Sequence, residues 1–262
     1  MGAIISVWSS ARDAGKTVFL YTLAKHLSGI LNKELKILLC CMNLSYGSLA
    51  KLFGIGTNEL NLEDIVNFKI YPDNSVSDLI GSIAKYNNFY FVGSQKTNPA
   101  YSSRNIKAYE NVLEEFKESF DLVLVDTMSW RENALTNMVL EKSDYVLNIL
   151  KQDKQELDSH PFVTQKDIAY IVNMYRDIYP DKNDLASTYG LKDVFTLPYC
   201  NELQEMKNRE KLALYIQHDT EYNNSVKDIS HFLAGKLNLP LDKAAVIKKK
   251  GRGLFGILEG LK

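Results

Sequence analysis

Short apolar runs alternate with longer amphipathic stretches along most of the chain. The runs at 3–8, 37–41 and 121–125 are apolar at nearly every position, which predicts strands that are covered on both faces. Strands are expected at 3–8, 35–42, 89–92, 121–125, 145–150, 168–173 and 194–197. Helices are expected at 16–27, 62–68, 75–85, 106–120, 132–141 and 226–237.

Strands separated by helices indicate βαβ units and therefore a mostly parallel sheet. The chain has 262 residues, enough for one large domain with a well-buried core. We expect an α/β fold, a doubly wound, mostly parallel sheet flanked by helices. This domain would cover residues 1–240, with a distinct tail at 241–262. Ligands on such sheets bind beyond the carboxyl ends of the strands.

Charge is balanced over the whole chain but not along it. The net charge is −1 and the sequence pI is about 6.4, which gives no overall signature of a nucleic-acid-binding protein. Residues 243–262 hold six basic residues and one acidic residue, a net charge of +5. The other 242 residues then hold 25 of the 31 basic and 31 of the 32 acidic residues, a net charge of −6. This asymmetry marks the C-terminal end as a separate functional element.

Cysteine and histidine usage gives no sign of a metal centre or a disulfide framework. Cys40 and Cys41 lie in an apolar run and are expected in the core, and with Cys200 they make a sparse, odd set that fits a reducing cytoplasm. The histidines are far apart in sequence and are interpreted as solvated or packing residues: His26, His160, His218 and His231. No apolar run approaches the roughly 20 residues of a membrane span, and the N-terminus does not resemble a signal peptide. We expect a cytoplasmic protein.

The strongest chemical signal lies between the first expected strand and the first expected helix. It reads Ser10-Ala11-Arg12-Asp13-Ala14-Gly15-Lys16-Thr17. This context and the Gly-Lys-Thr ending are those of a P-loop, although Ser10 stands where the pattern has glycine. Lys16 would reach the β- and γ-phosphates of a nucleotide, and Thr17 would bind Mg²⁺ through its hydroxyl. The alternative is an ordinary βα turn with an exposed lysine.

A second signal is the apolar strand that ends in Asp126-Thr127. A carboxylate at the end of such a strand holds Mg²⁺ in P-loop proteins, usually through water. Alternatively, Asp126 caps the segment that follows. The two motifs occur in the order that a P-loop nucleotide site requires.

These residues resemble the ParA/MinD group of P-loop ATPases. In that family the loop reads K-G-G-x-G-K-[ST], and its first lysine reaches the nucleotide of the partner subunit in an ATP-bound dimer. Ala11 replaces this lysine here, and Arg12 next to it is a candidate substitute. Both first glycines are also replaced, although Asp13 tolerates left-handed backbone better than most residues. The resemblance implies nucleotide contacts from Ser10, Ala11, Arg12, Asp13, Ala14, Gly15, Lys16, Thr17 and Val18.

The segment after the second strand departs from the family as well. The family places aspartates there, one of which positions the attacking water, whereas this chain has Cys41 and Asn43. Asn43 can orient water but cannot act as a base. We therefore expect ATP binding with slow or absent hydrolysis. The following residues, 46–54, resemble most closely the CpaE/TadZ-like members that place pilus and secretion machinery.

The resemblance also implies a site for the base. Asn173 ends an expected strand where the family has an asparagine that reads adenine, and Pro198 matches a position beside the base. Asn173 offers both a donor and an acceptor, as adenine recognition needs. The alternative is a polar residue that happens to end a strand.

The tail combines a basic cluster with apolar residues that would share one helical face. The basic residues are Lys248, Lys249, Lys250, Arg252 and Lys262, and the apolar ones are Leu254, Phe255, Ile257, Leu258 and Leu261. This pattern suits an interfacial helix on an anionic membrane surface, and it resembles the membrane-targeting tail of MinD. The alternatives are docking on a protein partner and packing on the domain itself.

Taken together, these features indicate an ATP-binding protein that dimerises on ATP with Mg²⁺. It would act at the inner face of the cell membrane and position a membrane-associated assembly with an unidentified protein partner. One alternative is a DNA-partition ATPase, which the net charge of −6 outside the tail disfavours. Another is a non-hydrolysing scaffold with a relic P-loop. A metabolic kinase is less well supported, because no motif for an acceptor substrate stands out.

Overall fold

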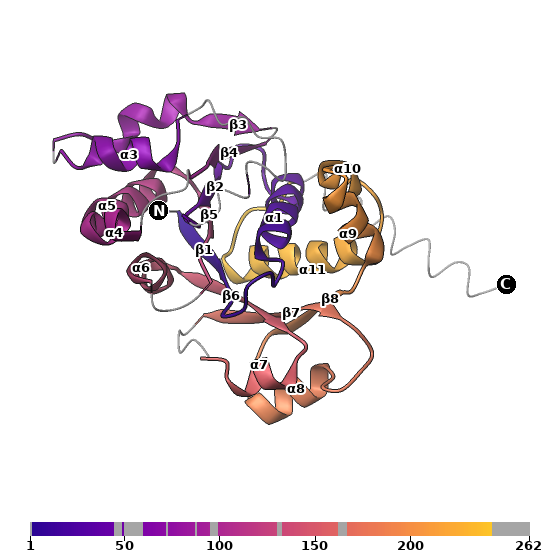
Figure 1. Ribbon diagram of the computed structural model, residues 1–262. Helices are drawn as coiled ribbons and strands as arrows, with labels where there is room; N and C mark the ends of the chain where they lie inside the picture. The colour runs from indigo at the N-terminus through magenta and orange to yellow at the C-terminus, as the bar shows by residue number, and fades with distance from the viewer. Residues whose placement is uncertain are drawn as a thin grey trace.

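The computed structural model describes residues 2–44, 49, 60–71, 73–86, 88–94, 99–129, 133–161 and 167–242 (Figure 1). The strands are β1 (Ala3–Trp8), β2 (Ile37–Cys41), β3 (Ala84–Tyr86), β4 (Phe89–Val92), β5 (Leu122–Asp126), β6 (Tyr145–Lys151), β7 (Ile168–Tyr175) and β8 (Val194–Pro198). The helices are α1 (Lys16–Ile30), α3 (Leu62–Lys69), the 3₁₀ helix η1 (Val76–Ser82), α4 (Pro99–Arg104), α5 (Ile106–Ser119), α6 (Ala134–Lys142), α7 (Lys154–Asp158), α8 (Lys182–Tyr189), α9 (Asn201–Asn208), α10 (Leu212–Tyr215) and α11 (Glu221–Lys236).

The strands form one sheet in the order β3-β4-β2-β5-β1-β6-β7-β8. Each neighbouring pair is parallel except β3 with β4 at one edge. The apolar runs are buried along their whole length in β2 and β5, as strands covered on both faces require. The predicted fold class is therefore confirmed.

Helices cover both faces of this sheet (Figure 1). On one face α1 and α11 pack against each other and against inward side chains such as Val7 and Leu124. On the other face α3, α5 and α6 pack against side chains such as Ile4 and Val123. Alternate residues of one strand thus enter two separate cores, which fixes the register of each strand.

The sequence-based assignment was wrong in one segment and incomplete in others. Residues 75–85 were expected as one helix, but they form η1 followed by the start of β3. Lys85 pairs there with Tyr90 across an antiparallel ladder, so pairing with β4 overrides local helix preference. Short helices that the pattern did not indicate are α4, α7, α8, α9 and α10.

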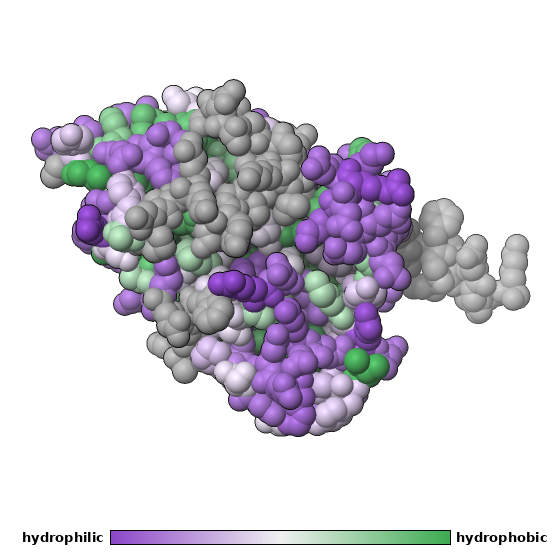
Figure 2. Space-filling view, viewed as in Figure 1, coloured by the Kyte–Doolittle hydropathy of each residue, from purple (hydrophilic) through white to green (hydrophobic). Residues whose placement is uncertain are grey.

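On the side of the molecule seen in Figure 2, the surface of the described residues is mostly hydrophilic. Over α7, α8 and α9 the described side chains are predominantly polar, and apolar colour is confined to small separate areas (Figure 2). Most buried apolar residues lie in two large clusters on the two faces of the sheet, and smaller clusters form around Tyr170 and Trp8. Cys40 and Cys41 are fully buried, as predicted. Within the described parts of the chain, none of the helices combines the length and the apolar character that crossing a bilayer requires.

The direction of the strand order changes at β1. Its neighbours are β5 on one side and β6 on the other, so the chain leaves β1 toward one edge of the sheet and later crosses to the opposite edge. Loops at the carboxyl ends of strands diverge at such a point and leave room for a ligand. The segments that follow β1, β5, β6 and β7 meet at the carboxyl ends of these strands.

Candidate functional site

Residues 9–15 connect β1 to α1 and take the backbone conformation of a phosphate-binding turn. Gly15 is left-handed at φ 82°, and a Cβ there would lie 2.2 Å from Nδ2 of Asn173, so only glycine fits. Asp13 is also left-handed at φ 52°, as its residue type allows. Among the described residues no side chain caps α1, whose first N–H groups and positive dipole end are therefore suited to an anion.

Lys16 is buried and already bound at the start of α1. Its Nζ donates to Oγ of Ser129 at 2.6 Å, and that hydroxyl donates to the carbonyl oxygen of Ala11 at 3.1 Å. Burial lowers the pKa of the Lys16 ammonium, against the opposing effect of the carboxylates of Asp126 and Asp13. Ser129 thus links the segment after β5 to the loop, a contact that sequence reasoning missed.

Thr17 and Asp126 come together as predicted. Oγ1 of Thr17 donates to Oδ2 of Asp126 at 3.1 Å, because β5 lies next to β1 and both end at the same edge. The carboxylate is fully buried, and within the described residues its Oδ1 has no hydrogen-bond partner. Burial raises the pKa of Asp126 to about 6, although Lys16 and Thr17 act in the opposite direction.

This pair fits a magnesium ion. A hydroxyl and a carboxylate with one unsatisfied oxygen are hard oxygen donors, which Mg²⁺ prefers together with water and phosphate. Thr17 would bind the ion directly, and Asp126 would hold it through water. No cluster of three or more His, Cys, Asp or Glu residues occurs in the described part of the chain. A site completed by phosphate and water is therefore consistent with the donors present.

Asn173 lies beside the loop rather than apart from it. Its Nδ2 donates to the carbonyl oxygen of Ala14 at 2.7 Å, which ties the end of β7 to the turn. Pro198 ends β8 and pairs with Tyr175, so it lies at the same edge of the sheet. The guanidinium of Arg176 lies 4.1 Å from the ring centroid of Tyr199 at this edge. Adenine recognition by Asn173 and Pro198 remains a prediction.

The remaining predicted residues lie around the loop without a demonstrated role. Ala11 and Ala14 are half-buried and buried, and Arg12 is exposed on the loop. Val18 is buried in the first turn of α1. Asn43 follows β2, and its carbonyl oxygen accepts a hydrogen bond from Ser94 at 3.2 Å. The resemblance at 46–54 and the tail at 243–262 lie outside the described residues, Leu49 excepted.

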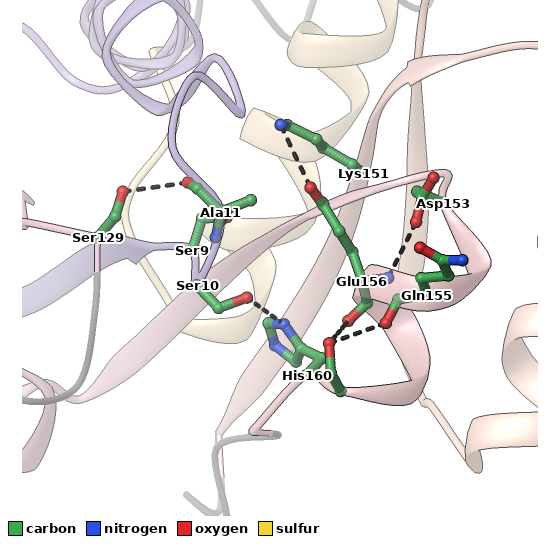
Figure 3. Close-up of polar contacts among 10 residues, drawn as sticks. Ser9, Ser10, Ala11, Ser129, Lys151, Asp153, Gln155, Glu156 and His160 are labelled. Carbon is green, nitrogen blue, oxygen red and sulfur yellow. Dashed lines mark hydrogen bonds and ion pairs between the residues drawn. The ribbon is translucent and has the colours of Figure 1, made fainter.

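His160 is a site residue that sequence reasoning did not single out. Its Nδ1 lies 2.7 Å from Oγ of Ser10 in the loop (Figure 3). Its Nε2 lies 2.9 Å from Nδ2 of Asn148. The side chain is buried beside Trp8, with ring centroids 5.5 Å apart. Because Ser10 and His160 are 150 residues apart, no local pattern could have paired them.

Together these contacts form a compact anion-binding loop with a lysine, a hydroxyl and a carboxylate at the start of α1. Such an arrangement can hold the phosphates of a nucleotide and a magnesium ion between them. Among the contacts described, Lys16 supplies the positive charge, and Thr17 and Asp126 supply oxygen atoms for a cation.

Comparison with family models and with curated proteins gave no match. Solved structures gave clear matches. A ParA family ATPase from Chlorobium tepidum has a TM-score of 0.71 and 16% identity, covering 88% of this chain and 99% of that one. The Pyrococcus horikoshii MinD structure with Mg-ADP has a TM-score of 0.70 and 18% identity, covering 95% and 99%.

A third match is a plasmid partition protein from Borrelia burgdorferi bound to AMPPNP. It has a TM-score of 0.67 and 17% identity, covering 90% of this chain and 100% of that one. Two of these three structures hold an adenine nucleotide or its analogue. The strand order, the loop and the near-complete overlap establish that this chain has the fold of the ParA/MinD-type P-loop ATPases.

Proposed function

We propose that this chain binds Mg-ATP at the loop formed by residues 10–17. The main support is that Lys16, Thr17 and Asp126 lie together at the start of α1, which no side chain caps among the described residues. A buried lysine and free N–H groups favour polyphosphate, and the orphaned oxygen of Asp126 favours a magnesium ion beside it. The adenine nucleotides in two similar structures support the choice of nucleotide.

Hydrolysis would be slow. Cys41 stands in place of a family aspartate, is fully buried on β2, and has its pKa raised to about 12 by burial, so its thiol cannot serve as a base. Asn43 can only orient water. Ala11 stands in place of the signature lysine. The positive charge that this lysine brings to the partner's nucleotide in the family is therefore missing, unless Arg12 supplies it.

We further propose that ATP binding produces a homodimer that positions a membrane-associated assembly of the pilus, secretion or division type. Support comes from the basic, apolar tail in the sequence, in which each basic residue near an anionic surface contributes about 1 kcal/mol. Two tails on one dimer would bind far more strongly than one. The protein would then act at the inner face of the cell membrane.

The direct test is calorimetric titration of the purified protein with ATP and Mg²⁺, with the oligomeric mass measured in parallel. Wild type should bind in the micromolar range and form dimers with ATP. Lys16→Ala should lose at least tenfold in affinity, because it removes a charge from the polyphosphate site. Lys33→Ala is the matched control. Lys33 is exposed just before β2, at the amino ends of the strands and far from the loop, so this variant should bind ATP as tightly as wild type.

The main alternative is a scaffold that has lost nucleotide binding. Two hydrogen bonds support this alternative: Lys16 donates to Ser129, and Ser129 donates to the carbonyl oxygen of Ala11. They give the lysine ammonium and the serine hydroxyl partners without a ligand. Absence of binding in wild type, with a folded protein, would favour the scaffold over the ATP switch. Binding to DNA that weakens steeply with salt would instead favour a partition ATPase.

A further inference from the structure

The loop departs from the P-loop pattern at Ser10, and the structure gives this departure a partner. Ser10 stands where the pattern has glycine, which offers a phosphate only its backbone N–H. The serine hydroxyl lies 2.7 Å from Nδ1 of His160 (Figure 3). A hydroxyl at this point of the loop is a possible additional donor, provided that its orientation is fixed.

The imidazole that meets Ser10 is itself held on several sides. Nε2 lies 2.9 Å from Nδ2 of Asn148, which is fully buried on β6. The ring packs beside Trp8, and Trp8 and Asn148 are register partners in the β1–β6 pair. The backbone N–H of His160 donates to Leu157 at 3.2 Å, at the end of α7. The ring position is therefore set by the sheet rather than by the loop.

The partner atoms determine which nitrogen carries the proton. In the structure the amide nitrogen of Asn148 faces Nε2, whereas Oδ1 of Asn148 has no partner among the described residues. In this orientation the amide donates and Nε2 accepts. In the neutral ring the proton is then on Nδ1, which donates to Oγ of Ser10. The hydroxyl accepts this bond with a lone pair, and its own proton stays available for another acceptor.

We propose that His160 is a positioning residue that orients the Ser10 hydroxyl as a donor to a bound phosphate. This inference rests on the proposed function, since it assigns a further ligand to the same phosphate site. In this proposal Nδ1–H holds the oxygen in place, and the Ser10 O–H rotates toward a phosphate bound at the start of α1. Ser10 and His160 together would replace part of the phosphate binding that the glycines and the signature lysine provide in the ParA/MinD loop.

A mutant cycle on Mg-ATP affinity tests the proposal. Ser10→Gly restores the P-loop residue but removes the hydroxyl, and should weaken binding about tenfold, the value of one hydrogen bond to a charged group. His160→Leu should weaken it by a similar factor. The double variant should bind no more weakly than either single variant, because both remove the same interaction.

Further variants separate positioning from a general effect on the fold. His160→Asn keeps an amide donor near the position of Nδ1 and should recover part of the lost affinity. His218→Leu removes an exposed imidazole at the end of α10 and should have no effect. In a ¹⁵N NMR spectrum of the nucleotide-free wild type, the His160 ring should show the Nδ1–H form.

The outcomes distinguish this inference from the proposed function. If wild type binds Mg-ATP and both Ser10→Gly and His160→Leu bind equally well, only the inference is overturned. Additive losses in the double variant, or an Nε2–H ring, would also overturn it. If wild type binds neither Mg-ATP nor inorganic pyrophosphate, the proposed function and the inference both fall.

Discussion

At the scale of single residues, the buried carboxylate of Asp126 carries an energetic cost and has a clear chemical use. Its carboxylate is fully buried, and within the described residues Oδ1 has no hydrogen-bond partner. Its pKa is raised from 3.8 to about 6, and each pKa unit corresponds to about 1.4 kcal/mol, so ionising the group costs on the order of 3 kcal/mol. A magnesium ion beside it would offset this cost, which explains why a charge is kept there.

Asp126→Asn should therefore stabilise the nucleotide-free protein by up to about 3 kcal/mol at neutral pH, because it removes the buried charge and keeps the shape. The same variant should lose the increase in ATP affinity that Mg²⁺ gives wild type. Thermal unfolding and calorimetry with and without Mg²⁺ measure the two effects. A lower melting temperature for the variant at pH 7 would contradict the burial argument.

The pH dependence provides the control for this prediction. A folded-state pKa above the unfolded value means that Asp126 favours the folded state below about pH 4 and loses this contribution as pH rises through about 6. The stability difference between wild type and Asp126→Asn should thus shrink from pH 7 to pH 5. Over the same interval Mg²⁺ should cease to strengthen ATP binding in wild type, since the carboxyl becomes protonated.

At the scale of elements, the sequence predicted the parts of the site that are local. The turn from β1 to α1 is contiguous, and β5 is so apolar that the position of Asp126 at its end follows from the strand itself. The contacts of Ser129 with Lys16 and of His160 with Ser10 span 113 and 150 residues. Only the strand order brings these residues together, so no local pattern could indicate them.

The errors in the elements have the same origin. Residues 84–86 adopt an extended conformation because β4 pairs with them. The helix α7 has only five residues, too few to show a helical period of apolar positions in the sequence. The amphipathic helix α5 was predicted to within one residue, since its apolar face is visible in the sequence. For α1 and α11 the type was predicted, but α1 ends three residues later and α11 begins five residues earlier than expected.

The link between β7 and the loop gives a prediction at this scale. Asn173→Ala removes the hydrogen bond from Nδ2 to the carbonyl oxygen of Ala14 and should destabilise the protein by about 1 kcal/mol. If Asn173 also reads adenine, the variant should lose more affinity for ATP than for pyrophosphate, which has no base. Calorimetry with both ligands makes the comparison. An equal loss of affinity for ATP and for pyrophosphate would mean that Asn173 only supports the loop and does not read the base.

At the scale of the whole molecule, the structure has the ParA/MinD-type fold, and the tail is the feature that would connect it to a surface. The described residues between 2 and 242 carry the sheet and the loop, whereas the concentrated positive charge lies at 243–262. A nucleotide-dependent dimer would double the number of tails. Membrane binding is therefore expected to depend on ATP as well as on the tail.

Sedimentation with anionic liposomes tests this dependence. Wild type should sediment more with Mg-ATP than without, and a chain that lacks residues 248–262 should not sediment. A variant with Lys248→Ser, Lys249→Ser and Lys250→Ser keeps the apolar residues and should bind more weakly, by about 3 kcal/mol. Because Arg252 and Lys262 remain, its binding should depend on salt less than that of wild type. Equal sedimentation of the full and truncated chains would rule the tail out as the membrane anchor.

The central claim is that residues 10–18 and Asp126 form a working Mg-nucleotide site. Backbone amide NMR of the labelled protein during titration with Mg-ATP tests it most directly, because it reports both binding and place. The largest shifts are expected at the amides of Gly15, Lys16, Thr17 and Val18. They should saturate with ATP in wild type and require at least about tenfold more ATP in Lys16→Ala. Saturable shifts confined to another surface, or none at these amides, would contradict it.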